Sequence, residues 1–193
     1  NSGLVVPPKI APIQVVVIPI QQKKEGVLEA ANKIAESLAG FRVKVDSTDR
    51  TRGFKFAEQE MRGIPVRVEI GPKDLEAGKC VLCRRDTREK IVKSTDVELV
   101  KYVKELLETI QKDMYNRAVE RRDKLTFTAH NLKEMENILN TQPGSIHADW
   151  CGDEACETKI KEIKGCKSRC ITVEPLIDGK CVCCGKEAKH HVI

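Results

Sequence analysis

Long apolar stretches and a targeting leader are both missing from this sequence. A membrane-spanning helix needs about 18 or more apolar residues in succession, and no such run occurs among the 193 residues. The first residues also lack the charged region, apolar run and small residues that make a secretory signal. We therefore expect a cytoplasmic protein, in a reducing compartment where closely spaced cysteines are metal ligands or free thiols more often than disulfides.

Aromatic side chains are scarce as well, with one Trp, two Tyr and four Phe. Phe54 and Phe56 could stack on nucleic-acid bases, but with so few aromatics we expect them to be needed in the core. The sequence shows no internal repeat and no low-complexity tract. Its 40% of apolar residues is enough for one large or two small globular cores without disulfide cross-links.

Charge is distributed unevenly along the chain. Residues 1–125 hold 25 Lys and Arg against 19 Asp and Glu, a net charge of +6, whereas residues 126–193 hold 9 against 10, a net charge of −1. A basic domain beside a nearly neutral, cysteine-rich one fits a nucleic-acid binder with a structural appendage. An ordinary solvated surface is the alternative interpretation of this charge.

Hydrophobic periodicity predicts an α/β domain over residues 12–95. Apolar, β-branched or alternating runs of the kind found in strands occupy residues 11–20, 41–46, 65–71, 79–85 and 89–94. Apolar residues at helical spacing occupy residues 26–40 and 54–63, and the second of these helices ends at Gly63. The pattern predicts a mixed five-stranded sheet with flanking helices, closed by a hairpin.

One long helix is predicted over residues 96–124, with Thr95 and Glu98 as a capping box at its start. It would link the α/β domain to a small α+β domain over residues 125–193, in which the cysteines gather. Residues 1–11 are interpreted as a linker that enters the first domain. The chain is therefore expected to contain two domains joined by a helix.

Two pairs of cysteines in the second domain have the spacing of a structural zinc site. Cys151 and Cys156 are separated by four residues, and Cys181 and Cys184 by two. Two short loops that each present two thiolates can build a closed tetrahedral site, in which zinc stabilises the fold and performs no catalysis. Cys183 is an alternative to Cys184, and an iron–sulfur centre is an alternative to zinc.

The other cysteines and histidines fit this metal site less well. Cys80 and Cys83 form a C-x-x-C motif, but it lies in a strand pattern, whereas the thioredoxin-like redox motif begins a helix. Cys166 and Cys170 lack the tight turn that presents two thiolates to one ion. The pair of His190 and His191 is expected in a closing strand.

Two longer motifs carry a family resemblance. The run "GFKFAEQEMRGIPVRVEIGPKDLEAG", followed by "RRDT", resembles the anticodon-binding domain of class II aminoacyl-tRNA synthetases, and specifically that of the prolyl-tRNA synthetases. The motifs "CGDEAC" and "GKCVCCGKEA" resemble the zinc-binding C-terminal domain of the archaeal and eukaryotic type of this family. The related glycyl, threonyl and histidyl enzymes share the anticodon-binding fold but lack this C-terminal module. The combination of the two motifs therefore distinguishes the prolyl-tRNA synthetases from these enzymes.

The resemblance implies that this segment is the tRNA-recognition part of a larger ligase. The catalytic domain would lie upstream of Asn1, would use ATP and Mg²⁺ to join proline to tRNA(Pro), and would form a homodimer. We find no motif for ATP or proline in this segment, so alone it should be inactive. Two loop positions depart from the family pattern, because Arg52 stands where proline is usual and Arg88 where glycine is usual.

The resemblance also implies which residues contact tRNA. Proline anticodons share guanine at the second and third positions, whose pairing edge a carboxylate and a Lys or Arg can recognise once the bases are unstacked. The positions that match the family's base-reading surface are Glu60, Arg67, Lys73 and Asp74. Those that match its phosphate contacts are Arg84, Arg85, Arg88 and Lys90.

Other interpretations remain open for these residues and for the whole chain. Glu60 could be a solvated helix residue, Arg67 and Glu69 could pair with each other, and the two consecutive arginines could be a charged strand end. The chain could also be a free-standing RNA-binding or regulatory zinc protein, or a thiol redox or iron–sulfur protein.

Overall fold

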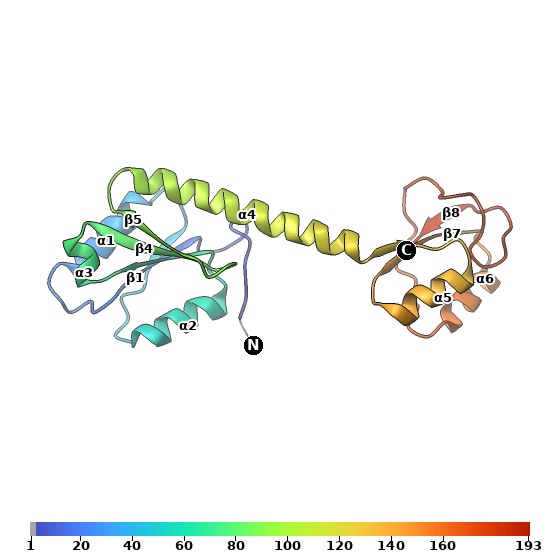
Figure 1. The fold of residues 1–193 in the computed structure, drawn as a ribbon, viewed down its shortest axis with the longest axis horizontal. Helices are drawn as coiled ribbons and strands as arrows, with labels where there is room; N and C mark the ends of the chain where they lie inside the picture. The colour runs from blue at the N-terminus through green and yellow to red at the C-terminus, as the bar shows by residue number, and fades with distance from the viewer. Residues whose placement is uncertain (1–2) are drawn as a thin grey trace. The chain divides into compact units, whose positions relative to one another are not determined.

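The structure is a computed structural model that describes residues 3–193 and divides into two compact units after Arg117 (Figure 1). Asn1 and Ser2, the start of the predicted linker, lie outside the described residues. The predicted fold class is confirmed: a mixed five-stranded sheet is followed by a long helix and then by a small domain that holds a cysteine cluster.

The first unit is built on a sheet with the strand order β2-β1-β3-β4-β5. Its strands are β1 (Val15–Pro19), β2 (Val43–Val45), β3 (Val66–Ile70), β4 (Lys79–Arg84) and β5 (Lys90–Ser94). Strand β1 runs parallel to β2 and β3, whereas β4 is antiparallel to both of its neighbours. The mixed sheet follows from the connections, because helices join the parallel strands and a tight turn joins β4 to β5.

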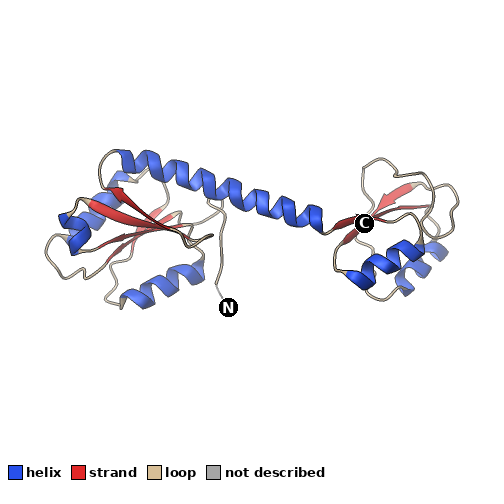
Figure 2. Cartoon of the chain, viewed as in Figure 1, coloured by secondary structure: helices blue, strands red, loops and turns tan. Residues whose placement is uncertain are grey.

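Four helices accompany this sheet: α1 (Val27–Ser37), α2 (Arg52–Arg62), α3 (Pro72–Glu76) and α4 (Glu98–Lys124) (Figure 2). Alternate strand residues face α1 and α4 on one side, as Val15 and Val17 do, and α2 lies on the other side (Figure 1). Helix α2 covers only part of its face, so Lys90 and Val92 of β5 remain exposed.

The C-terminal end of α2 meets the N-terminal segment of the chain. The backbone N–H groups of Leu4 and Val6 donate to the carbonyls of Met61 and Gly63 at 3.3 and 3.1 Å. Gly63 ends the helix with φ +74, as predicted, and a Cβ at this position would lie 2.8 Å from Leu4. Glycine is therefore required here both by the left-handed conformation and by the close approach of the segment.

The capping box predicted for α4 is wrong, although the helix itself is confirmed over Glu98–Lys124. The carboxylate of Asp96 accepts from the backbone N–H of Glu98 at 3.0 Å, in the role predicted for Thr95. The hydroxyl of Thr95 lies 3.2 Å from the carbonyl oxygen of Gly78, to which it donates. Two adjacent residues could each cap the helix, and the contact with Gly78 keeps Thr95 away from it.

The second unit has a three-stranded sheet with the order β6-β7-β8. Its elements are β6 (Thr126–Thr128), α5 (Leu132–Thr141), β7 (Ser145–Trp150), α6 (Glu154–Glu162) and β8 (His190–Val192). The buried apolar residues that pack together are few: Ala129, Met135, Ala148 and Val182. A core of this size provides little stability, so a cross-link within the unit has a large effect.

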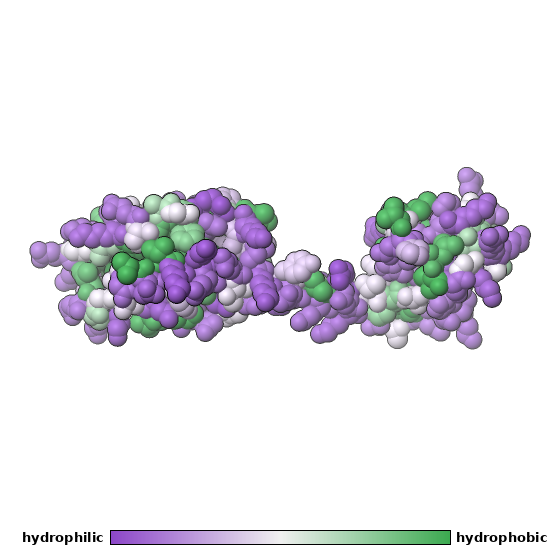
Figure 3. Space-filling model, turned by 90° about the horizontal axis from the view of Figure 1, so that it is seen from above, coloured by the Kyte–Doolittle hydropathy of each residue, from purple (hydrophilic) through white to green (hydrophobic). Residues whose placement is uncertain are grey.

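One face of the chain is drawn in Figure 3 by the hydropathy of its residues. Hydrophilic residues cover most of the face drawn in Figure 3, and smaller hydrophobic patches interrupt them on each unit. Among residues 3–193, none of the helices combines the length and the apolar character that crossing a membrane requires.

Candidate functional site

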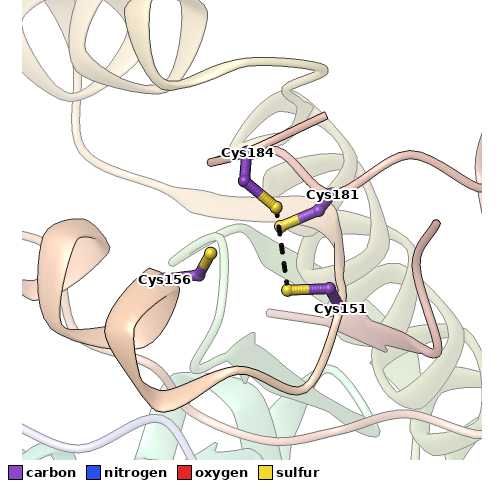
Figure 4. A group of neighbouring side chains, drawn as sticks. All are labelled: Cys151, Cys156, Cys181 and Cys184. Atoms are coloured by element: carbon purple, nitrogen blue, oxygen red, sulfur yellow. Dashed lines mark hydrogen bonds between the residues drawn. The ribbon is translucent and has the colours of Figure 1, made fainter. Parts of the chain in front are cut away.

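The four predicted metal ligands meet in one place. Cys151 follows β7, Cys156 lies in the first turn of α6, and Cys181 and Cys184 come from a turn ahead of β8. Their sulfur atoms all lie within 4.8 Å of one another (Figure 4). Cys183, the alternative ligand, is not a member of this cluster.

The geometry of the cluster fits a single tetrahedral ion. With metal–sulfur bonds of about 2.3 Å, a tetrahedron places its sulfur atoms about 3.8 Å apart. The Sγ atoms of Cys184 and Cys151 are 3.9 Å apart. A polynuclear iron–sulfur cluster would insert several iron and sulfide atoms between the thiolates and would hold them further apart. The donor set and its spacing therefore suit one ion such as Zn²⁺, with no position left for water.

Cys181 is prepared to act as a thiolate. Burial raises the pKa of its thiol, but backbone N–H groups of Cys184, Cys183 and Cys151 hydrogen-bond to it and lower the pKa to about 7. For Cys156, burial and then hydrogen bonding with Cys184 and Cys151 raise the pKa. The turn thus stabilises one negative sulfur, which gives an incoming cation its first ligand.

Cys80, Cys83, Cys166 and Cys170 lie away from the metal cluster, and none of the nine cysteines, all within the described residues, forms a disulfide. Cys80 and Cys83 lie in β4, as predicted, where burial raises the pKa of Cys80 to about 11. A thiol with such a pKa is a poor nucleophile at neutral pH, which argues against a redox pair. Cys166 packs beside Met135, and Cys170 is exposed, so neither joins the metal cluster.

The first unit holds a second polar cluster, which we call the Arg67 cluster: Phe56, Glu60, Arg67, Glu69 and Lys90. The guanidinium of Arg67 donates through Nη1 to Glu60 Oε1 and through Nε to Glu69 Oε1, both at 3.0 Å. It lies 3.9 Å from the ring centroid of Phe56. The ammonium group of Lys90 lies 3.3 Å from Glu69 Oε2.

These contacts fix the Arg67 cluster while leaving its rim open to solvent. Arg67 and Glu69 are buried, so their mutual pairing stabilises both charges. The side chain of Glu60 is 36% exposed and that of Lys90 is 54% exposed. An ionised carboxylate has about four lone-pair sites, so Glu60 can accept further hydrogen bonds while it holds Arg67. Phe56 packs against the core and also makes a cation–π contact with Arg67.

Arg84 and Arg85, the two consecutive arginines, are buried and hydrogen-bonded within the first unit. Arg84 is buried and donates to both oxygens of Asp86, at 3.0 and 2.9 Å, and to Asp113 of α4 at 2.7 Å. Arg85 is also buried, and its Nε lies 3.2 Å from the carbonyl oxygen of Glu60. A phosphate would have to compete with these partners, whereas Arg88 and Lys90 are exposed.

Three other predicted tRNA contacts lie just beyond the ends of strands, Arg88 in the turn after β4 and Lys73 and Asp74 in α3 after β3. Arg88 is exposed and has φ +63, the left-handed conformation that favours the glycine usual at this position. Lys73 is exposed on α3. Asp74 accepts from the backbone N–H of Gly71 at 2.9 Å and so caps that helix. Within residues 3–193, neither Lys73 nor Asp74 has a recorded hydrogen bond or ion pair with the Arg67 cluster.

Sequence reasoning missed Asp86, whose side chain is fully buried between Arg84 and Arg117. Burial raises the pKa of Asp86, but hydrogen bonds from both arginines outweigh it and hold the pKa below its usual value. A carboxyl group with a lowered pKa in the folded state stabilises the fold above its unfolded pKa of about 3.9. That contribution is lost as the pH falls through the folded pKa.

Acid should therefore weaken the first unit, and Asp86→Asn should reduce this pH dependence. Denaturant titrations at neutral pH and below about pH 4 would measure the free energy of unfolding of both proteins. Asp49→Asn is the matched control, because Asp49 pairs with Lys23 at the exposed surface of the same unit. An unchanged acid dependence in the Asp86 variant would show that the buried network is not its source.

Comparisons with known proteins match both units. The family model described as "Anticodon binding domain" matches residues 14–108, and that described as "Prolyl-tRNA synthetase, C-terminal" matches residues 132–193. Curated relatives named proline-tRNA ligase include those of Lachnoclostridium phytofermentans (56% identical over 98% of this chain) and Clostridium novyi (54% over 100%). The chain belongs to the prolyl-tRNA synthetase family. It spans 40% of the length of these relatives.

The predicted resemblance to the prolyl-tRNA synthetases is confirmed by these matches. The anticodon-binding match contains the whole Arg67 cluster, and the C-terminal match contains all four cysteines of the metal cluster. The Arg67 cluster therefore lies in the matched anticodon-binding domain, and the metal cluster lies in the matched C-terminal domain.

Proposed function

We propose that this chain reads the anticodon of proline tRNA for a prolyl-tRNA synthetase, and that zinc bound by the four cysteines stabilises its C-terminal unit. The two domain matches and the names of the relatives support this role. In the proposal, the whole enzyme is a cytoplasmic homodimer whose catalytic domain joins proline to tRNA with ATP and Mg²⁺. The present chain contributes recognition and performs no chemistry.

The single observation that carries this proposal is the Arg67 cluster on the open part of the sheet. A guanine offers two N–H donors beside its O6 acceptor. The carboxylate of Glu60 is partly exposed and held in place by Arg67, so it can accept from those donors without having to be ordered on binding. A fixed carboxylate rejects bases that present an acceptor at this position, because two acceptors face each other.

Two adjacent guanines require two groups that recognise them. We assign one guanine to Glu60 with the support of Arg67, and the other to Lys73 with Asp74. Lys73 is exposed and can reach O6 or N7, while the carboxylate of Asp74 retains acceptor capacity beside the N–H of Gly71. The exposed cations Arg88 and Lys90 then contact phosphates next to the unstacked bases.

Replacing Arg88 tests the phosphate contacts separately from base recognition. Arg88→Gly removes the guanidinium and suits the left-handed turn, so the fold should be unaffected. We expect weaker binding to every tRNA, by a similar factor, and a fall of about one in the slope of log affinity against log salt. Arg121→Ala, an exposed arginine of α4 outside the anticodon-binding match, is the control. A loss confined to proline tRNA would contradict a phosphate role.

A footprinting experiment tests where the chain binds. Nuclease digestion of proline tRNA with and without the 193-residue chain should show protection of the anticodon loop. Protection confined to other parts of the tRNA, or equal protection of unrelated RNA, would contradict the proposal and favour a general RNA-binding protein.

A further inference from the structure

Three potential metal ligands meet in the second unit apart from the cysteine cluster. They are His147 of β7, His191 of β8, and Glu174 of the segment between α6 and β8. One ligand atom from each lies within 4.8 Å of the others, and none of the three belongs to the four-cysteine set. His191 lies in a strand, as predicted, but the spacing of the three residues in the sequence does not indicate that they meet.

The distances among these atoms fit one face of a metal coordination shell. His147 Nδ1 lies 2.9 Å from His191 Nε2 and 3.6 Å from Glu174 Oε2. His191 Nε2 lies 3.9 Å from the same carboxylate oxygen. A tetrahedral ion with bonds of about 2.0–2.1 Å separates its ligand atoms by about 3.3 Å. The three distances bracket this value, so small rotations of the side chains would suffice.

The orientation of His191 favours a ligand role. Its Nδ1 lies 2.8 Å from the carbonyl oxygen of Pro175, which can only accept, so Nδ1 carries the proton. In the neutral ring Nε2 then presents its lone pair to His147 and Glu174. Histidines that bind metals characteristically donate their second ring N–H to a carbonyl or carboxylate in this way. His191 is only 6% exposed, so its packing holds that orientation.

The remaining two ligands give the site access to solvent. His147 is half-buried, and the side chain of Glu174 is 59% exposed. The segment that carries Glu174 is anchored close by, because the carboxylate of Asp149 accepts from the backbone N–H groups of Ile177 and Gly179. An ion could therefore enter from the side of Glu174, and the backbone beyond Glu174 is already fixed to β7.

We propose that His147, His191 and Glu174 bind a second divalent ion of the kind that imidazole prefers, with Zn²⁺ as its representative. Two imidazoles and one carboxylate leave a fourth position for water or another ligand, unlike the closed four-cysteine site. The ion would join the Glu174 segment to β7 and β8, in a unit whose core is small. This inference does not depend on tRNA recognition.

Zinc titration of the 193-residue chain, with the cysteine site already filled, tests this site. Calorimetry should detect binding of a second equivalent of Zn²⁺. Glu174→Gln should lower the affinity for this second ion by more than about 10–100-fold, which is the effect of losing a residue that only hydrogen-bonds to a metal ligand. His147→Ala should act likewise. His130→Gln is the control, because it removes an exposed imidazole paired with Asp178 in the same unit and should leave both equivalents intact.

Two further observations keep the test decisive. Because Glu174 is exposed, the Glu174→Gln chain should melt at the wild-type temperature before the second equivalent of zinc is added. This variant therefore decides the outcome if the His147 variant fails to fold. Co²⁺ at the second site should show no thiolate-to-metal charge-transfer band. The proposal is overturned by the absence of a second equivalent, by equal affinity in Glu174→Gln, or by a thiolate band, which would indicate adventitious binding to other cysteines.

Discussion

A chain that carries both Cys151→Ser and Cys156→Ser is expected to lose its tightly bound zinc and most of the folded structure of its second unit. The wild-type chain should retain about one tightly held zinc after dialysis. The four thiolates converge on one point, and the core around them contains few buried residues. Apparent zinc-binding energies in such sites reach about 10–16 kcal/mol, which exceeds the stability of a small domain.

Metal analysis and circular dichroism would measure both parts of this result. The first unit should remain folded in the variant and after chelation, because its core contains none of the four cysteines. Cys80→Ala with Cys83→Ala is the matched control, since these two thiols lie in β4 and should leave the zinc content unchanged. Full zinc content in the Cys151 and Cys156 variant would show that the ligands have been assigned wrongly.

The second large effect is expected from Glu60→Gln in the Arg67 cluster. Glutamine keeps the shape of the side chain and an oxygen that can accept from Arg67, but it replaces an ionised acceptor with an amide donor. If Glu60 accepts from a guanine, binding of proline tRNA should weaken by about 1–3 kcal/mol, which is about 5–150-fold. Binding of a tRNA without guanine in its anticodon should change far less.

Glu58→Gln is the matched control for this prediction. Glu58 lies on the same helix and pairs with Arg62, and it is also partly exposed. Its replacement removes the same charge from α2, so it accounts for any general electrostatic effect on tRNA. Equal losses in the two variants, or equal losses for both tRNAs, would exclude base recognition by Glu60.

Hydrophobic periodicity predicted all five strands of the sheet and the long helix, because each lies within a longer apolar or alternating run of the sequence. The short elements α3 and β6 escaped prediction, since Pro72–Glu76 and Thr126–Thr128 are too short for a periodic pattern. The start of α4 was misassigned because Asp96, next to Thr95, offered an equally good cap. Local competition of this kind is decided by tertiary contacts that a sequence does not display.

The candidate sites were predictable to different degrees for a similar reason. The four cysteines of the metal cluster could be predicted, with Cys183 left as an alternative to Cys184, because each pair lies in one short segment of the chain. The partners of Arg84 could not, since Asp113 comes from α4 and meets it only when that helix packs on the sheet. His147, Glu174 and His191 are likewise far apart in the sequence and meet through the pairing of β7 with β8.

The central claim is that this chain distinguishes the proline anticodon from others. The most direct test compares binding of the 193-residue chain to proline tRNA and to the same tRNA with both anticodon guanines replaced, at moderate salt. With about 1–3 kcal/mol from each guanine, we expect the replacement to weaken binding by about 2–6 kcal/mol. Equal affinities for the two tRNAs would contradict anticodon recognition and leave only binding that is blind to sequence.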